Sequence, residues 1–146
     1  MLAIALFVSF ASLDPPPGWA VTALKAMKAP GLLVGYPDGL HSRPIPTRYE
    51  CAIAVGATIT QARSILLELY DADITSPVIV RDVVWVRSWI PHLIALDNLH
   101  RAFKPELRAV EMDFPVEQIR QLPVDALALQ LRLLTHPFTG RPQFGH

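Results

Sequence analysis

The residues of this chain that could do chemistry gather where a helix is expected to begin, at Thr47-Arg48-Tyr49-Glu50. Thr47 is a good N-cap residue, and Glu50 follows three positions later, which is the spacing of a capping box. In a capping box the Thr47 hydroxyl accepts from the Glu50 N–H, and the Glu50 carboxylate accepts from the Thr47 N–H. Arg48 then lies in the first turn beside unpaired backbone N–H groups. Because a guanidinium and free N–H groups both attract anions, the motif predicts an anion-binding site.

Each candidate contact residue also has a role that involves no ligand. Arg48 could be a surface arginine that pairs with a nearby carboxylate such as Asp38. The indole of Trp19 offers an apolar plane with a polar edge, so it could contact a ligand, or it could anchor the first helix in the core. Tyr36 is expected to be structural more than a ligand contact. Both roles of Arg48 and of Trp19 therefore stay open from the sequence.

A turn lies between Trp19 and Arg48, at Gly35-Tyr36-Pro37-Asp38-Gly39. Pro37 fixes φ near the value that suits the second position of a β-turn, and Asp38 and Gly39 tolerate the conformations that follow. Gly35 suits a place where the backbone must pass close to another group. The sequence therefore predicts a tight loop ahead of the helix that Thr47 caps.

These pieces resemble an S-layer homology domain in their order and spacing, from Asp14 to about Val55. Three segments carry the resemblance: Asp14-Pro15-Pro16-Pro17-Gly18-Trp19-Ala20, Gly31-Leu32-Leu33-Val34-Gly35-Tyr36-Pro37-Asp38-Gly39 and Thr47-Arg48-Tyr49-Glu50. The chain departs from the family pattern in a shorter first turn, in Pro30 and in Tyr49, where alanine is usual. The resemblance implies a non-catalytic module that binds cell-wall polymer, with Arg48 and Trp19 at the glycan site and Gly35 and Tyr36 beside it.

A second resemblance begins at Phe103-Lys104-Pro105-Glu106-Leu107. It is similar to a Phe-x-Pro-Glu-Leu stretch, followed by a short turn and an amphipathic helix, that comes after the S-layer homology module in some bacterial envelope proteins. This similarity implies that a helical region follows the module.

The composition bounds the remaining possibilities. A chain of 146 residues has room for one domain, or for a small domain with an appendage, and 51% hydrophobic residues are ample for a core. The 13 basic and 13 acidic side chains balance, which argues against a partner that is nucleic acid. Cys51 is the single cysteine, so an intrachain disulfide is excluded, and we expect its thiol to be buried.

The sequence offers no catalytic constellation and no compact set of metal ligands. His92 and His100 are eight positions apart, and no carboxylate completes a ligand set with them. Neither a nucleophile elbow nor a phosphate-binding glycine loop is present. Trp85 and Trp89 lie four apart on one helical face, which favours packing over ligand binding. We therefore expect neither a cofactor nor a metal.

Apolar spacing and prolines predict a mostly α fold, in which a helix–loop–helix module is followed by two or three additional helices. The predicted helices are 19–28, 48 to about 70, and 81–103, which Pro91 should kink or divide. Pro105 should split the next segment, and Pro123 should begin a last helix that runs to about His136. Five leucines make that helix too apolar to be solvated, so they must pack on the module or on a partner: Leu127, Leu129, Leu131, Leu133 and Leu134. No strict heptad repeat persists over three turns, so a long coiled coil is not predicted.

Four segments are predicted: a short secretory signal at 1–11, the module at 12–70, a helical region at 71–136 and a flexible tail at 137–146. The favoured hypothesis is an exported, non-catalytic protein of the bacterial envelope that binds an anionic cell-wall polysaccharide. It would act as a homo-oligomer or as part of a longer envelope protein. The alternative is a helical protein-interaction or structural adaptor with no glycan binding, whose leucine-rich C-terminal helices dock a partner.

Overall fold

The protein is described here from a computed structural model, which covers residues 14–33 and 46–135. The loop residues Gly35, Tyr36, Asp38 and Gly39, the predicted signal at 1–11 and the predicted tail at 137–146 lie outside these ranges. What was predicted for those residues stays a prediction.

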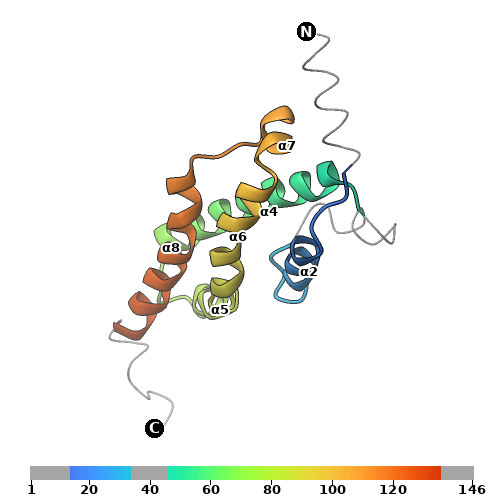
Figure 1. Ribbon diagram of the computed structural model, residues 1–146. Helices are drawn as coiled ribbons and strands as arrows, with labels where there is room; N and C mark the ends of the chain where they lie inside the picture. The colour runs from blue at the N-terminus through green and yellow to red at the C-terminus, as the bar shows by residue number, and fades with distance from the viewer. Residues whose placement is uncertain (1–13, 34–45, 136–146) are drawn as a thin grey trace, which may run out of the picture.

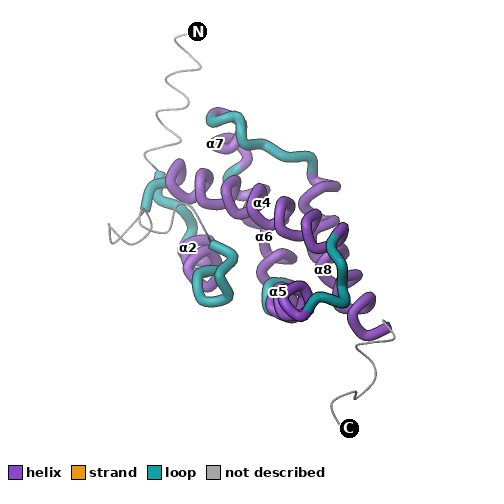
Figure 2. Tube along the Cα trace, turned by 180° about the vertical axis from the view of Figure 1, so that it is seen from behind, coloured by secondary structure: helices purple, strands orange, loops and turns teal. Residues whose placement is uncertain are grey.

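The described part of the chain is mostly α, as predicted, and its regular elements are all helices. They are α2 (Gly18–Ala26), α4 (Arg48–Asp71), α5 (Pro77–Arg87), α6 (Ile90–Ala102), α7 (Lys104–Ala109) and α8 (Val116–Thr135). Figures 1 and 2 show the long helix α4 crossing one side of the molecule, with α6 and α8 side by side on the other. Helix α4 contacts each of the other helices, so it is the centre of the packing.

Three of the six described helices have a proline in their first turn. Pro77, Pro91 and Pro105 each lie in the first turn of a helix, where a missing N–H costs nothing and the fixed φ suits the helix. The predicted divisions at Pro91 and Pro105 are therefore confirmed.

The prediction that Pro123 begins the last helix is wrong. Helix α8 begins at Val116, and Pro123 lies inside it. Pro123 has no N–H to donate to the carbonyl of Ile119, one turn earlier, which normally disfavours a helix interior. The helix continues because buried side chains anchor it on both sides of the proline: Ile119 and Leu122 before it, Ala126 and Leu129 after it.

One hydrophobic core connects the predicted module at 12–70 with the predicted helical region at 71–136. The buried cluster contains Leu24 of α2 and Ile59 of α4 together with Leu96 of α6 and Leu129 of α8. Cys51 is fully buried in this core, and desolvation raises the pKa of its thiol to about 11. The junction near residue 71 is thus a turn between two helices of one packed unit.

The turn after α2 is attached to the rest of the molecule by two tryptophans. Trp85 and Trp89 form a T-shaped pair with ring centroids 4.8 Å apart, which confirms that they serve packing. Both indole N–H groups donate to the Pro30 carbonyl oxygen, at 2.8 and 2.9 Å. Gly31 follows at φ +74°, a conformation that favours glycine, and its Cα lies against the Trp85 ring.

Among the described residues, one helix, α4, is long and apolar enough in composition to cross a membrane. Half of its most apolar window is buried inside the protein, and the central helix of a packed core has the same composition. Its length and composition are therefore weak evidence for a membrane span.

Candidate functional site

The capping box at the start of α4 is present as predicted. The Thr47 hydroxyl accepts from the Glu50 N–H at 3.1 Å, and the Thr47 N–H donates to Glu50 Oε1 at 3.1 Å. The cap fixes where α4 begins, and it therefore fixes the direction in which Arg48 leaves the first turn.

The Arg48 side chain is bound by residues at the junction of α6 and α7. Its Nε donates to Glu106 Oε1 at 2.5 Å, and its Nη2 donates to the Ala102 carbonyl at 2.6 Å. The guanidinium also lies over the Phe103 ring, 5.1 Å from the centroid. The side chains of Arg48 and Glu106 are 17% and 1% exposed. Arg48 therefore takes the pairing role that the sequence left open, with Glu106 as its carboxylate partner.

This ion pair joins the two stretches that carry the family resemblances. Arg48 belongs to the Thr-Arg-x-Glu motif, and Glu106 belongs to the Phe-x-Pro-Glu-Leu stretch, 58 positions later. The carboxylate neutralises the guanidinium, and Glu106 Oε2 has no hydrogen-bond partner in the part of the chain that the structure describes. The pKa of the neighbouring Tyr49 hydroxyl is raised, first by desolvation and second by the Glu106 charge. Little positive potential is thus left at Arg48 to attract an anion.

Trp19 lies in the first turn of α2 and is 51% exposed, so it is not a core residue. Together with Asn98, Arg101 and Ala102 of α6 it lines a shallow, open hollow of ≈ 340 Å³. Ala102 is the residue whose carbonyl accepts from Arg48. Ala102 therefore connects the two candidates, because it lines the hollow together with Trp19 and its carbonyl accepts from Arg48.

The polar groups of this hollow are accessible. The Arg101 side chain is 66% exposed, and its Nη2 lies 3.6 Å from Asp97 Oδ2, a carboxylate that also accepts from Arg120 at 3.1 Å. Asn98 is exposed, one helical turn before Arg101 on the same face of α6. An indole face, an amide and a loosely held guanidinium around one open hollow are groups that bind sugars carrying an acidic substituent.

Sequence reasoning missed Asn98 and Arg101. Their spacing of three residues on the polar face of a helix was visible, but such pairs are common on solvated helices. Their position opposite Trp19 depends on how α2 packs against α6, and no local pattern encodes that contact.

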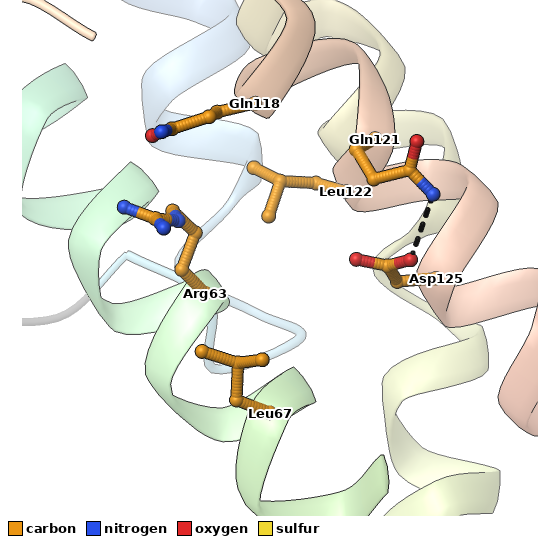
Figure 3. Close-up of a pocket in the computed structure, with 6 residues that line it drawn as sticks. All are labelled: Arg63, Leu67, Gln118, Gln121, Leu122 and Asp125. Carbon is orange, nitrogen blue, oxygen red and sulfur yellow. Dashed lines mark hydrogen bonds between the residues drawn. The ribbon is translucent and has the colours of Figure 1, made fainter.

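A second, smaller hollow of ≈ 130 Å³ lies between α4 and α8. Figure 3 shows Leu67 of α4 and Leu122 of α8 extending into this gap from opposite helices, while Gln121 and Asp125 stand at its edge. The Gln121 amide donates to Asp125 at 2.9 Å, so these two polar groups satisfy each other. None of the described residues that line this second hollow is aromatic, so we take the Trp19 hollow as the candidate site.

Within residues 14–33 and 46–135, no three His, Cys, Asp or Glu side chains lie close enough together to hold a metal ion. The buried His100 ring instead shares a hydrogen bond of 2.7 Å with Asp113. Arg108 donates to the other oxygen of Asp113 at 3.2 Å. These groups hold the turn between α7 and α8 against α6.

No protein-family model matches this chain, and no curated protein or solved structure matches it either. The resemblance to S-layer homology domains therefore stays a prediction, and the function must be argued from the geometry of the site.

Proposed function

We propose that this chain is a non-catalytic cell-wall-binding module, which holds an anionic polysaccharide of a bacterial envelope in the hollow beside Trp19. The observation that carries the proposal is the exposed Trp19 indole, which shares an open hollow with the exposed guanidinium of Arg101. The S-layer homology pattern of the sequence, which ends at the Thr47 capping box, supports the same class of ligand.

Each group in the hollow has a distinct part in this mechanism. The Trp19 ring stacks on the apolar face of one sugar, and the Asn98 amide exchanges hydrogen bonds with its hydroxyls. The Arg101 fork pairs with a carboxylate or pyruvyl group on the same or the next sugar. Pockets for small molecules are usually concave and enclose most of the ligand, whereas an open hollow suits a polymer that lies across the surface.

Arg48 acts in this proposal as a positioning residue. By binding the Ala102 carbonyl and Glu106, it fixes the end of α6, which carries Asn98 and Arg101. Gly35 and Tyr36 remain candidates for additional contacts from the loop, outside the described residues. The ligand is a wall polymer, so the proposal includes the predicted export of the chain to the envelope.

The test is co-sedimentation with purified bacterial sacculi that retain their anionic polymer, compared with the same sacculi stripped of it. We expect the wild type to bind only the first preparation. Trp19→Ala and Arg101→Ala should each weaken binding about tenfold, which is the loss of roughly 1.4 kcal/mol of contact. The matched control is Arg87→Ala, an exposed arginine at the end of α5 and outside the hollow, which should bind like the wild type.

Arg48→Ala is a poor test of polysaccharide binding. It would leave Glu106 buried without its cation and would disturb the fold. Each variant should therefore first match the wild type in thermal unfolding. Wild-type binding by both Trp19→Ala and Arg101→Ala would overturn the assignment of the hollow. Failure of the wild type to bind any sacculi would favour the alternative of a helical adaptor.

A further inference from the structure

Helix α8 has a second apolar face that the core does not use. Four side chains on its outer side are 52% to 73% exposed: Val124, Leu127, Leu131 and Leu134. The face that packs on the core consists of other residues, among them Ile119, Leu122, Ala126 and Leu129. We call the four exposed residues the α8 stripe.

The α8 stripe has the spacing of a helix–helix seam. Its members follow one another at intervals of three, four and three residues, which is the a and d pattern of a heptad. Val124 and Leu131 take the a positions and Leu127 and Leu134 take the d positions. A β-branched residue at a with leucine at d, as Val124 provides with Leu127, favours two strands in parallel pairs. The stripe covers less than three helical turns, which agrees with the absence of a long coiled coil.

Helix α6 adds one more exposed apolar side chain, Ile94, next to the N-terminal end of the α8 stripe. Arg120 of α8 donates to Asp97 of α6, and Figure 1 shows the two helices running in opposite directions. Because the helices are antiparallel, one turn after Arg120 in α8 lies at the level of one turn before Asp97 in α6. Val124 and Ile94 are therefore expected at the same level, and Ile94 is also 59% exposed. Scattered exposed apolar side chains are normal on a monomer, whereas apolar side chains that gather on one face mark interaction sites.

The positions that flank the α8 stripe carry no charge. In heptad terms these are the e and g positions, which usually hold the ion pairs that select a partner. They are Gln121, Pro123, Ala128, Gln130 and Thr135. A second copy of the same helix thus brings no like charges together across the seam, whereas a helix that relies on charged flanks finds nothing here to pair with.

We propose that the α8 stripe pairs with the α8 stripe of a second copy of this chain, which makes the protein a weak two-fold dimer. A standard stable interface takes about 800 Å² and roughly 20–30 residues from each partner, and the stripe with Ile94 supplies five large apolar side chains. The dimer should therefore dissociate in the micromolar range or above. If the apolar segment at 1–11 or an unrelated protein covered the α8 stripe instead, no dimer would form through it.

The dimer would place two Trp19 hollows on one particle, and linked sites gain affinity for a repeating polymer without any new contact. That consequence rests on the proposed function. The dimer itself does not, because self-association is measured without any polysaccharide.

The test is sedimentation equilibrium of the whole chain over a wide range of protein concentrations. We expect the wild type to dimerise, and the double variant Leu127→Gln with Leu131→Gln to weaken the dimer at least about tenfold. Both leucines are half exposed, so the variant should keep the helical circular dichroism and the melting temperature of the wild type. The matched control is Leu67→Gln, an equally exposed leucine on α4 that lies at the smaller hollow, and it should dimerise like the wild type.

A wild type that stays monomeric at millimolar concentration would overturn the proposal. It would also be overturned if the double variant dimerised as well as the wild type, because the contact would then lie elsewhere on the chain. Loss of the dimer in Leu67→Gln alone would place the interface at the gap between α4 and α8.

Discussion

The buried pair of Arg48 and Glu106 ties the start of α4 to the start of α7 at the scale of single residues. A buried ion pair adds little net stability, because removing both charges from water costs about as much as their attraction returns. Removing one partner is different, since the other charge is left buried and unpaired. The pair is therefore a point at which a single substitution should have a large effect.

We expect Arg48→Ala to lower the free energy of unfolding by about 3–5 kcal/mol, because Glu106 would lose its cation at a site that water does not reach. Urea unfolding followed by circular dichroism measures this loss. The control is Arg120→Ala, which removes an arginine that is 61% exposed from its pair with Asp97 and should cost less than about 1 kcal/mol.

Replacing both partners provides an independent check on the same pair. Arg48→Met combined with Glu106→Leu leaves no unpaired charge, so it should recover much of the stability lost in Arg48→Ala. Equal stability of Arg48→Ala and the wild type would show that the ion pair does not hold these two helices together.

What could be predicted at this scale depended on distance along the chain. The Thr47–Glu50 cap was predictable because both residues belong to one helical turn. The partner of Arg48 was not, because Glu106 is 58 positions away and is brought in by the packing of α7 on α4. Asn98 and Arg101 could not be assigned to the Trp19 hollow from the sequence for the same reason, because they are far from Trp19 along the chain.

The turn after α2 is the feature that matters at the scale of elements. Gly31 has φ +74°, and a Cβ at this residue would lie 2.8 Å from the Trp85 ring. That ring and the Trp89 ring both donate to the Pro30 carbonyl, so neither can move without breaking a hydrogen bond. The two tryptophans thus hold the turn after α2 against α5 and the start of α6.

Gly31→Ala should therefore be destabilising. The left-handed backbone alone costs an alanine roughly 1–2 kcal/mol, and the displaced indole adds to this loss. Gly18→Ala is the matched control, because a Cβ there meets nothing within 4 Å and the residue begins a helix. Its stability should change by less than about 0.5 kcal/mol. Thermal unfolding of both variants decides the matter, and equal melting temperatures would contradict the role given to the turn.

Helix ends were predictable where a proline could stand in a first turn, as at Pro91 and Pro105. The prediction failed at Pro123 because a proline can start a helix or lie inside one. Which of the two occurs depends on whether the residues before and after the proline are buried in the core. The leucines of α8 were equally ambiguous. Their density predicted packing, but only the structure separates Leu129 in the core from Leu131 at the surface.

At the scale of the whole molecule, one core includes helices from both predicted segments. Helix α4 is buried along most of its length by α6, α7 and α8 together with α2 and α5. The sequence resemblance suggested a module that ends near residue 70. In the structure, the helices after residue 71 pack against α4, the long helix of that segment (Figure 2).

A fragment of residues 12–70 should therefore fail to fold by itself, because the buried face of α4 would lose most of its cover. We expect this fragment to show low helicity and no cooperative thermal transition in circular dichroism. A fragment of residues 12–135, which contains all six described helices, should show both. Cooperative unfolding of the shorter fragment would mean that the module is an independent domain.

The three tryptophans lie at two different places, so intrinsic tryptophan fluorescence can report ligand binding. The Trp85 and Trp89 indoles both donate to the Pro30 carbonyl at the turn after α2, and Trp89 is fully buried, whereas Trp19 is half exposed at the hollow. Indole fluorescence depends on the polarity around the ring, so a saccharide that covers Trp19 would shift the emission without any attached dye. A Trp19→Phe variant would keep the emission of Trp85 and Trp89, and this emission should not change when the saccharide is added.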